Sequence, residues 1–125
     1  MTPTPSCRVA VVEDSEDLRS LIATLLELEE DFELVGEAAD GEEALAVIAA
    51  VNPDLLLLDM ALPGMDGLEV LEHLGGNDAP RVVVYSGYSA PELVQSARDL
   101  GAVDYVVKGG PPDELIARLR AACAA

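Results

Sequence analysis

Four apolar segments of the sequence end in polar side chains that could take part in chemistry. Asp59 follows the four leucines of residues 55–58, the acidic pair Glu13 and Asp14 follows residues 8–12, Ser86 follows residues 82–85, and Lys108, the only lysine, follows residues 103–107. In open α/β folds, ligands bind where the carboxyl ends of parallel strands meet. Carboxylates, a hydroxyl and an ammonium at one such edge are typical of metal-assisted phosphoryl transfer.

Each of these residue types meets a chemical need of that reaction. Three carboxylates in a small cleft repel one another, and a hard divalent cation such as Mg²⁺ relieves the repulsion. Asp59 can then attack phosphorus as a carboxylate nucleophile and form an aspartyl phosphate. Mg²⁺ and the Lys108 ammonium neutralise the oxygens of the transferring group, and Ser86 donates a hydrogen bond to it.

The same residues also have structural interpretations when they are taken one at a time. Asp14 lies beside Ser15 at the expected start of a helix, where capping and metal binding can coexist. A serine or a single lysine after a strand is a weak signal. The hypothesis therefore depends on all four strand ends meeting in one place.

The rest of the sequence predicts strands and helices that alternate. Apolar runs bounded by turn or cap residues predict strands at about 7–12, 32–38, 54–59, 81–86 and 103–107. Continuously apolar runs are expected of parallel strands that are buried on both faces. Helical segments separate these runs, and three begin with a capping box: Asp40 with Glu43, Asp66 with Glu69, and Ser89 with Glu92.

This pattern predicts an α/β fold, a (βα)5 flavodoxin-like three-layer sandwich with helices on both faces of a parallel sheet. Of the two five-stranded orders that we weighed, 2-1-3-4-5 suits the polar residues better. It makes strands 1, 3, 4 and 5 neighbours, so that the four polar strand ends converge on one carboxyl edge.

Length, charge and hydropathy narrow the class of protein. The 125 residues suffice for one domain with a core, which we place at residues 7–125 after a flexible tail at residues 1–6. The net charge of −17 argues against direct binding of nucleic acid or of anionic membranes. No apolar stretch reaches the ~20 residues of a membrane span, and the N-terminus lacks the regions of a signal peptide. We therefore expect a cytoplasmic protein.

The two cysteines are expected to add little. Strand starts and helix ends share the lower edge of an alternating α/β sheet, so Cys7 and Cys123 could be neighbours. Cytosolic cysteines are nonetheless usually reduced, and we expect both to be thiols.

From Arg8 to Ala122 the chain resembles the receiver domain of two-component response regulators. The residues that carry the resemblance are 11–14, 36–45, 59–67, 86–87 and 101–108. The resemblance implies a signalling phosphoacceptor, not an enzyme with an external substrate, whose phosphorylation and dephosphorylation are self-catalysed. The segment at residues 32–45 looks most like receivers that carry a helix-turn-helix output domain, and no such domain follows in this sequence.

The resemblance also implies a role for each site residue. Asp59 would be the phosphoacceptor, Lys108 the partner of the phosphoryl group, and Ser86 with Tyr105 the switch. The implied Mg²⁺ ligands are Asp14 directly, Glu13 through water, Asp59, and the backbone carbonyl of Ala61. The backbone groups of Met60 and Gly87 would contact the phosphate.

The implied partners are a phosphodonor and a target. The donor would be a histidine kinase or a histidine phosphotransfer protein, and the target a downstream protein or a detached output domain. The output surface would comprise the fourth helix, the last strand and the last helix, and the resemblance also allows for a dimer that forms on phosphorylation. Four of the seven basic residues lie in the last 28 positions, so this end of the chain is less acidic than the rest.

Two features depart from the family pattern, and a third is expected to affect the rate at which phosphate is lost. Gly109 and Gly110 follow Lys108 where proline is common, so we expect a trans bond at 108–109 and a loose loop. Glu13 stands where aspartate is more usual. We expect Ala61 and Tyr88 to set the lifetime of the phosphorylated state, because alanine cannot hold the hydrolytic water and a tyrosine ring can screen its approach.

Two other classes of protein remain open. A flavodoxin-like electron carrier shares the fold, but its phosphate loop after the first strand would be rich in Gly, Ser and Thr, whereas residues 13–17 are mostly acidic. A haloacid-dehalogenase-type phosphatase would have a second aspartate two residues after Asp59, where this chain has Ala61. A yellow colour or turnover of a phosphate ester would favour these alternatives.

Overall fold

The computed structural model describes residues 6–75 and 79–124, which form a five-stranded parallel sheet flanked by helices. The strands are β1 (Cys7–Val12), β2 (Phe32–Ala38), β3 (Leu55–Leu58), β4 (Arg81–Ser86) and β5 (Asp104–Val107). Their order is β2-β1-β3-β4-β5, as predicted. The predicted strand bounds agree with these to within one residue. Most of the predicted tail at residues 1–6 lies outside the described residues.

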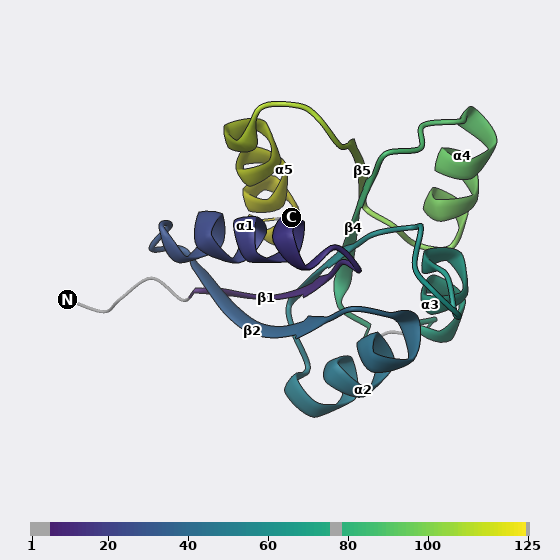
Figure 1. The fold of residues 1–125 in the computed structure, drawn as a ribbon, viewed down its shortest axis with the longest axis horizontal. Helices are drawn as coiled ribbons and strands as arrows, with labels where there is room; N and C mark the ends of the chain where they lie inside the picture. Colours follow the sequence, from purple (N-terminus) through teal and green to yellow (C-terminus); the bar gives the residue numbers. More distant parts are fainter. Residues whose placement is uncertain (1–5, 76–78, 125) are drawn as a thin grey trace.

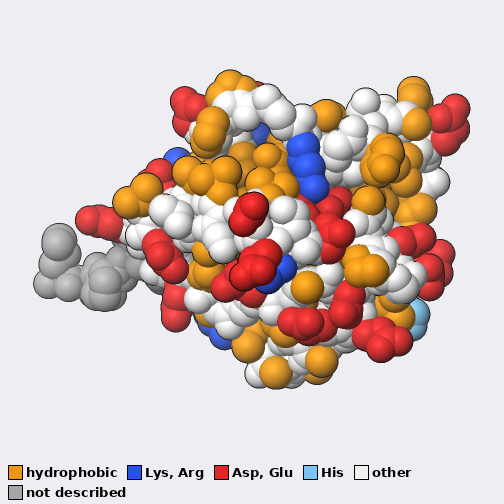
Figure 2. All heavy atoms as spheres, in the orientation of Figure 1, with side chains coloured by type: hydrophobic (Ala, Val, Ile, Leu, Met, Phe, Trp, Pro, Cys, Tyr) orange, Lys and Arg blue, Asp and Glu red, His pale blue; other side chains and the backbone are white. Residues whose placement is uncertain are grey.

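Helices cover both faces of the sheet, as Figure 1 shows. They are α1 (Glu16–Glu27), α2 (Gly41–Val51), α3 (Gly67–His73), α4 (Pro91–Asp99) and α5 (Pro112–Ala124). One face carries α1 and α5, and the other carries α2, α3 and α4. Acidic side chains spread over the middle and lower parts of the face in Figure 2, with few basic ones among them. None of the helices in the described ranges is long and apolar enough to cross a membrane.

The leucines of β3 fill two hydrophobic clusters, one on each side of the sheet. Leu56 and Leu58 point toward α2, α3 and α4, whereas Leu55 and Leu57 point toward α1 and α5. All four are at most 1% exposed. Successive side chains of a strand point to opposite faces, so a strand buried on both faces must be apolar throughout. The run of leucines thereby places Asp59 at the end of a fully buried strand.

The N-cap side chains of two of the three predicted capping boxes are confirmed, and the third N-cap is wrong. The side chains of Asp40 and Asp66 accept hydrogen bonds from the backbone N–H groups of Glu43 and Glu69. The N-cap of α4 is Ala90, with no side-chain hydrogen bond, and the predicted cap Ser89 lies one residue too early. Pro91 explains the difference, because proline has a fixed φ that suits the first helical position and so determines where α4 begins.

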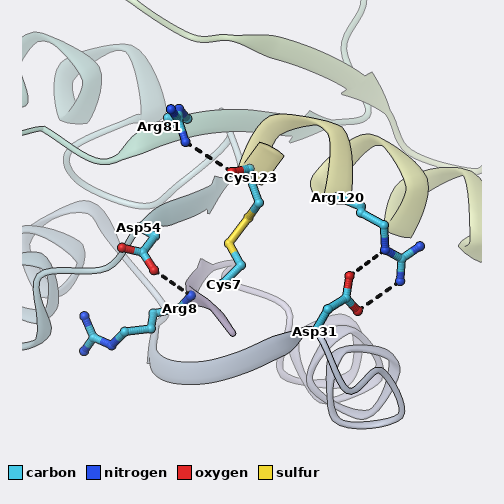
Figure 3. The surroundings of a disulfide bond; sticks show 7 residues. All are labelled: Cys7, Arg8, Asp31, Asp54, Arg81, Arg120 and Cys123. Carbon is cyan, nitrogen blue, oxygen red and sulfur yellow. Dashed lines mark hydrogen bonds and ion pairs between the residues drawn. A yellow bond between two sulfur atoms is a disulfide. The ribbon is translucent and has the colours of Figure 1, made fainter. Parts of the chain in front are cut away.

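The expectation of two free thiols is wrong, because Cys7 and Cys123 form a disulfide bond (Figure 3). Their Cα atoms are 6.2 Å apart. Cys7 begins β1 and Cys123 lies in the last turn of α5, so both belong to the edge of the sheet where strands start and helices end. The geometry anticipated by the topology is therefore present, and the argument from cellular compartment led to the wrong expectation.

None of the described peptide bonds is cis, as expected for Lys108–Gly109.

Candidate functional site

The register of the sheet brings the polar strand ends together. Val12 pairs with Leu58, Leu58 with Val84, and Ser86 with Val107. The ladder continues beyond the strands, because the N–H of Asp59 donates to the carbonyl of Val12 and the N–H of Lys108 donates to that of Ser86. The residues that follow β1, β3 and β5 therefore meet at one edge with Ser86, as predicted.

Three carboxylates form the centre of this edge. Glu13, Asp14 and Asp59 each offer an oxygen that lies within 4.8 Å of the others. Glu13 is 2% exposed and Asp59 3%, whereas Asp14 is exposed. Three hard oxygen donors at this separation are of the kind that Mg²⁺ prefers, so the residues present fit the ion. The Ala61 N–H donates to Oδ1 of Asp59 at 3.1 Å, and the metal contact of the Ala61 carbonyl stays a prediction.

Lys108 binds two of these carboxylates. Its Nζ lies 2.6 Å from Oε1 of Glu13 and 3.0 Å from Oδ2 of Asp59. The other Glu13 oxygen accepts a hydrogen bond from the Ser15 N–H at 2.9 Å. Sequence reasoning assigned Glu13 to a water-mediated metal contact and Lys108 to the phosphoryl group, and it missed their direct pairing. The two residues are 95 positions apart, and no local pattern in the sequence indicates their pairing.

Burial and pairing shift the pKa values of this pair. Burial raises the pKa of the Glu13 carboxyl above its ordinary value, and the hydrogen bond from Lys108 only partly opposes this. Burial by itself would lower the pKa of Lys108, but its hydrogen bonds to Glu13 and Asp59 raise the pKa above the ordinary value. Lys108 is therefore held as an ammonium between the two carboxylates.

Ser86 and Tyr105 are linked through the backbone of Tyr88. Ser86 is fully buried, and its Oγ accepts a hydrogen bond from the Tyr88 N–H at 3.2 Å. The hydroxyl of Tyr105 donates to the Tyr88 carbonyl at 2.5 Å, and Tyr105 is 6% exposed. The two predicted switch residues are thus joined, and Tyr105 already points inward in this structure. Tyr88 itself is 61% exposed.

Three further residues support the site and were not singled out from the sequence. The Arg19 guanidinium donates to the Glu13 carbonyl at 2.8 Å. The ring of Tyr85 lies beneath the Lys108 ammonium, with 5.8 Å between Nζ and the ring centroid. A Cβ added to Gly67 would lie 2.6 Å from the Asp59 carbonyl oxygen, so glycine is needed where α3 begins against the Asp59 turn. These contacts depend on tertiary packing, which the local sequence does not reveal.

The chain belongs to the response regulator receiver domain family, whose pattern matches residues 9–120. It is 39% identical over 129 residues to a protein-glutamate methylesterase/protein-glutamine glutaminase of Dechloromonas aromatica, with 94% of this chain and 37% of the relative covered. The chain spans about a third to a half of the length of the first curated relatives that it matches.

Solved structures show the same fold. The signal receiver domain of the response regulator NarL from Mycobacterium tuberculosis has a TM-score of 0.91 and 32% identity, with 98% of this chain and 99% of that chain covered. The CheX–CheY–BeF3–Mg complex from Borrelia burgdorferi has a TM-score of 0.85 and 27% identity, with 94% and 89% covered. The two-component receiver class predicted from the motifs is therefore confirmed.

Proposed function

We propose that Asp59 accepts a phosphoryl group from a histidine kinase or a histidine phosphotransfer protein in a Mg²⁺-dependent reaction, and that phosphorylation switches a protein-binding surface. The observation that carries this proposal is the buried Asp59 carboxylate at the carboxyl edge, between two further acids and Lys108. The BeF3 and Mg²⁺ named in the structure of the related complex support the same chemistry.

In the proposed reaction, a carboxylate oxygen of Asp59 forms a bond to phosphorus while the bond from phosphorus to the donor's imidazole nitrogen breaks. The electron pair of that bond returns to the imidazole. Glu13, Asp14, Asp59 and the Ala61 carbonyl would hold Mg²⁺, which supplies positive charge opposite the phosphoryl oxygens. The backbone N–H groups of Met60 and Gly87 donate to these oxygens. Apart from its two chain neighbours, no described residue has an atom within 4 Å of a Cβ added at Gly87, so there is space beside it.

Lys108 and Ser86 change partners in the proposed reaction. The Lys108 ammonium, which binds Asp59 and Glu13 in this structure, donates to the phosphoryl oxygens. In this structure the Ser86 hydroxyl accepts a hydrogen bond from the Tyr88 N–H. In the proposed reaction the hydroxyl turns to donate to the phosphoryl group, and its hydrogen bond with Tyr88 breaks. Because Tyr88 also accepts from Tyr105, the exchange is transmitted to β5 and to the surface formed with α4 and α5.

The proposed output is protein binding and not turnover of an external substrate. We do not assign to this chain the methylesterase activity named for one relative, because the chain covers only 37% of the length of that relative. The target would be a downstream protein or a detached output domain, with dimerisation on phosphorylation as a further consequence. The strongly negative chain makes a protein target more favourable than nucleic acid, and we place the domain in the cytoplasm.

Mass spectrometry with a small acyl-phosphate donor tests the proposal. The parent protein should gain one phosphoryl group in the presence of Mg²⁺ and none after chelation. Asp59→Asn should gain none, whereas the control Asp113→Asn, which replaces an exposed carboxylate in the first turn of α5, should match the parent. Labelling of Asp59→Asn at the parent rate would overturn the assignment.

A further inference from the structure

The edge of the sheet opposite Asp59 contains a cavity that the proposed function does not use. The cavity is open to solvent, has a volume of about 830 Å³ and is lined by Cys7, Cys123, Phe32, Pro53, Arg81 and Arg120, among others. Figure 3 shows the disulfide between the strand that begins at Cys7 and the last turn of α5. Both cysteines are only partly buried, so an incoming thiol can reach the bond from solvent.

Noncovalent contacts hold the two cysteine backbones independently of the sulfur–sulfur bond. The Cys7 N–H donates to the Asp31 carbonyl at 2.9 Å. The Arg81 guanidinium donates to the Cys123 carbonyl at 3.3 Å. Arg120, one turn before Cys123, pairs with Asp31 at 2.6 Å. These contacts keep the two sulfur positions adjacent after reduction, so the bond can form again.

The core contacts of α5 also survive cleavage of the disulfide. Leu115, Ile116 and Leu119 are at most 6% exposed and pack into the cluster beneath α1 and α5. Reduction therefore leaves the first turns of α5 docked on the sheet. It removes the covalent link only from the last turn of the helix.

We infer that Cys7 and Cys123 form a reversible thiol–disulfide exchange site, whose reaction partner is a dithiol that enters through this cavity. A thiolate of the dithiol attacks one cysteine sulfur, the Cys7–Cys123 bond breaks, and a mixed disulfide forms. The second thiol of the dithiol then resolves the mixed disulfide. Two electrons and two protons pass to the cysteines, and the dithiol leaves as a disulfide.

The exchange controls the stability of the domain. The bond links residues that are 116 positions apart, so it restricts nearly the whole unfolded chain. Disulfides in cytosolic proteins are usually transient and redox-sensing, which agrees with the proposed location of this domain. The inference does not depend on phosphotransfer, because neither cysteine belongs to the Asp59 site.

Thiol counting under native conditions tests the inference directly. After incubation with oxidised dithiothreitol, alkylation and mass spectrometry should detect no free thiol. After reduced dithiothreitol without denaturant, both cysteines should be alkylated, and transfer back into oxidised dithiothreitol, which accepts the two electrons, should restore the bond. The proposal would be overturned if two free thiols were found after the oxidising treatment. It would also be overturned if the disulfide were reduced only in the presence of denaturant.

Thermal unfolding and amide exchange provide a second measurement. Reduction should lower the Tm of the parent on the order of 10 °C. The double variant Cys7→Ser/Cys123→Ser should have the Tm of the reduced parent and should not respond to dithiothreitol. Amide exchange in the reduced parent should accelerate in residues 120–124 more than in residues 113–117, and a uniform change along α5 would contradict a local effect. Asp59→Asn should respond to dithiothreitol like the parent, which separates this inference from the proposed function.

Discussion

The two edges of the sheet both join β1 to the segment that contains β5 and α5, but they do so with different chemistry. At the carboxyl edge, the Lys108 ammonium faces three carboxylates and binds two of them. At the amino edge, Arg120 pairs with Asp31, and Cys7 is covalently bonded to Cys123. Excess negative charge therefore lies buried where we propose that a cation and a phosphoryl group bind, whereas the opposite edge is held by solvent-exposed ion pairs of Arg120 and by a covalent bond.

Removing the ammonium from the carboxyl edge should have the largest effect. Lys108→Met leaves the nearly buried Glu13 and Asp59 without their shared counter-ion. We expect phosphorylation by an acyl phosphate to slow by about 10²-fold or more. Without metal, the free energy of unfolding should fall by about 3 kcal/mol, as measured by urea titration in EDTA. Saturating Mg²⁺ should recover part of this loss.

The matched change at the amino edge is Arg120→Met. Its pair with Asp31 is exposed to solvent, so the urea midpoint and the rate of phosphorylation should change little. A loss of phosphorylation comparable to that of Lys108→Met would show that the two edges are not independent.

Adding a methyl group at the start of α3 should have the next largest effect. In Gly67→Ala, the new Cβ would meet the Asp59 carbonyl oxygen and the Met60 Cα at 2.6 and 2.7 Å. The Asp59 turn must shift, and we expect about 2 kcal/mol of destabilisation in urea together with slower phosphorylation. Gly75→Ala is the control, because the nearest contact of its Cβ with a described residue would be with the Glu72 carbonyl oxygen, at 3.7 Å. Equal midpoints for the two variants would contradict the tight approach.

The pairing of Asp104 with Arg118 predicts a smaller effect that depends on pH. Hydrogen bonds from Arg118 hold the pKa of the Asp104 carboxyl below its ordinary value. A lowered folded-state pKa contributes stability at pH values above the unfolded-state pKa of about 3.9, and this stability is lost as the pH falls through the lower folded-state pKa. Asp104→Asn should therefore cost no more than about 1 kcal/mol near neutral pH, since the pair is partly exposed.

Urea midpoints of the parent and Asp104→Asn, measured from neutral pH down to about pH 3, test this sign. The difference between the two proteins should shrink as the pH falls below about 4. A difference that grows toward acid pH would mean that another group controls this region.

Local signals in the sequence were enough to predict the strands, the sheet order and the carboxylate cluster. Apolar runs, cap residues and turn residues each act over a few positions, and the topology then aligns the strand ends. The pairing of Glu13 with Lys108 joins residues 95 positions apart, and no local pattern indicates it. No local pattern indicates the disulfide either. The topology correctly allowed Cys7 and Cys123 to be neighbours, but the argument from cellular compartment led to the wrong expectation of two thiols. Ser89 shows a local failure, because the fixed φ of Pro91 outweighed a plausible capping box.

The arginines of α5 show a related limit. From the sequence they counted among the four basic residues of the last 28 positions, which make this end of the chain less acidic. In the structure, Arg118 binds Asp104 of β5, and Arg120 binds Asp31 before β2. Both arginines therefore fasten α5 to other elements, which sequence position alone does not show.

The smallest expected effect concerns the lifetime of the phosphorylated state. The N–H and carbonyl of Tyr88 are held by Ser86 and Tyr105 through backbone atoms, so changing the side chain leaves both hydrogen bonds in place. Tyr88 is exposed and lies two residues beyond Ser86. We expect its ring to screen a water in line with the Asp59 oxygen. Tyr88→Ala should therefore speed phosphate loss a few-fold, whereas Tyr88→Phe, which keeps the ring, should change it little. The decay of phosphorylated protein after removal of the donor measures both rates. If Tyr88→Ala kept its phosphate as long as the parent, the geometry of the carboxylates around Mg²⁺, rather than the ring, would set the rate.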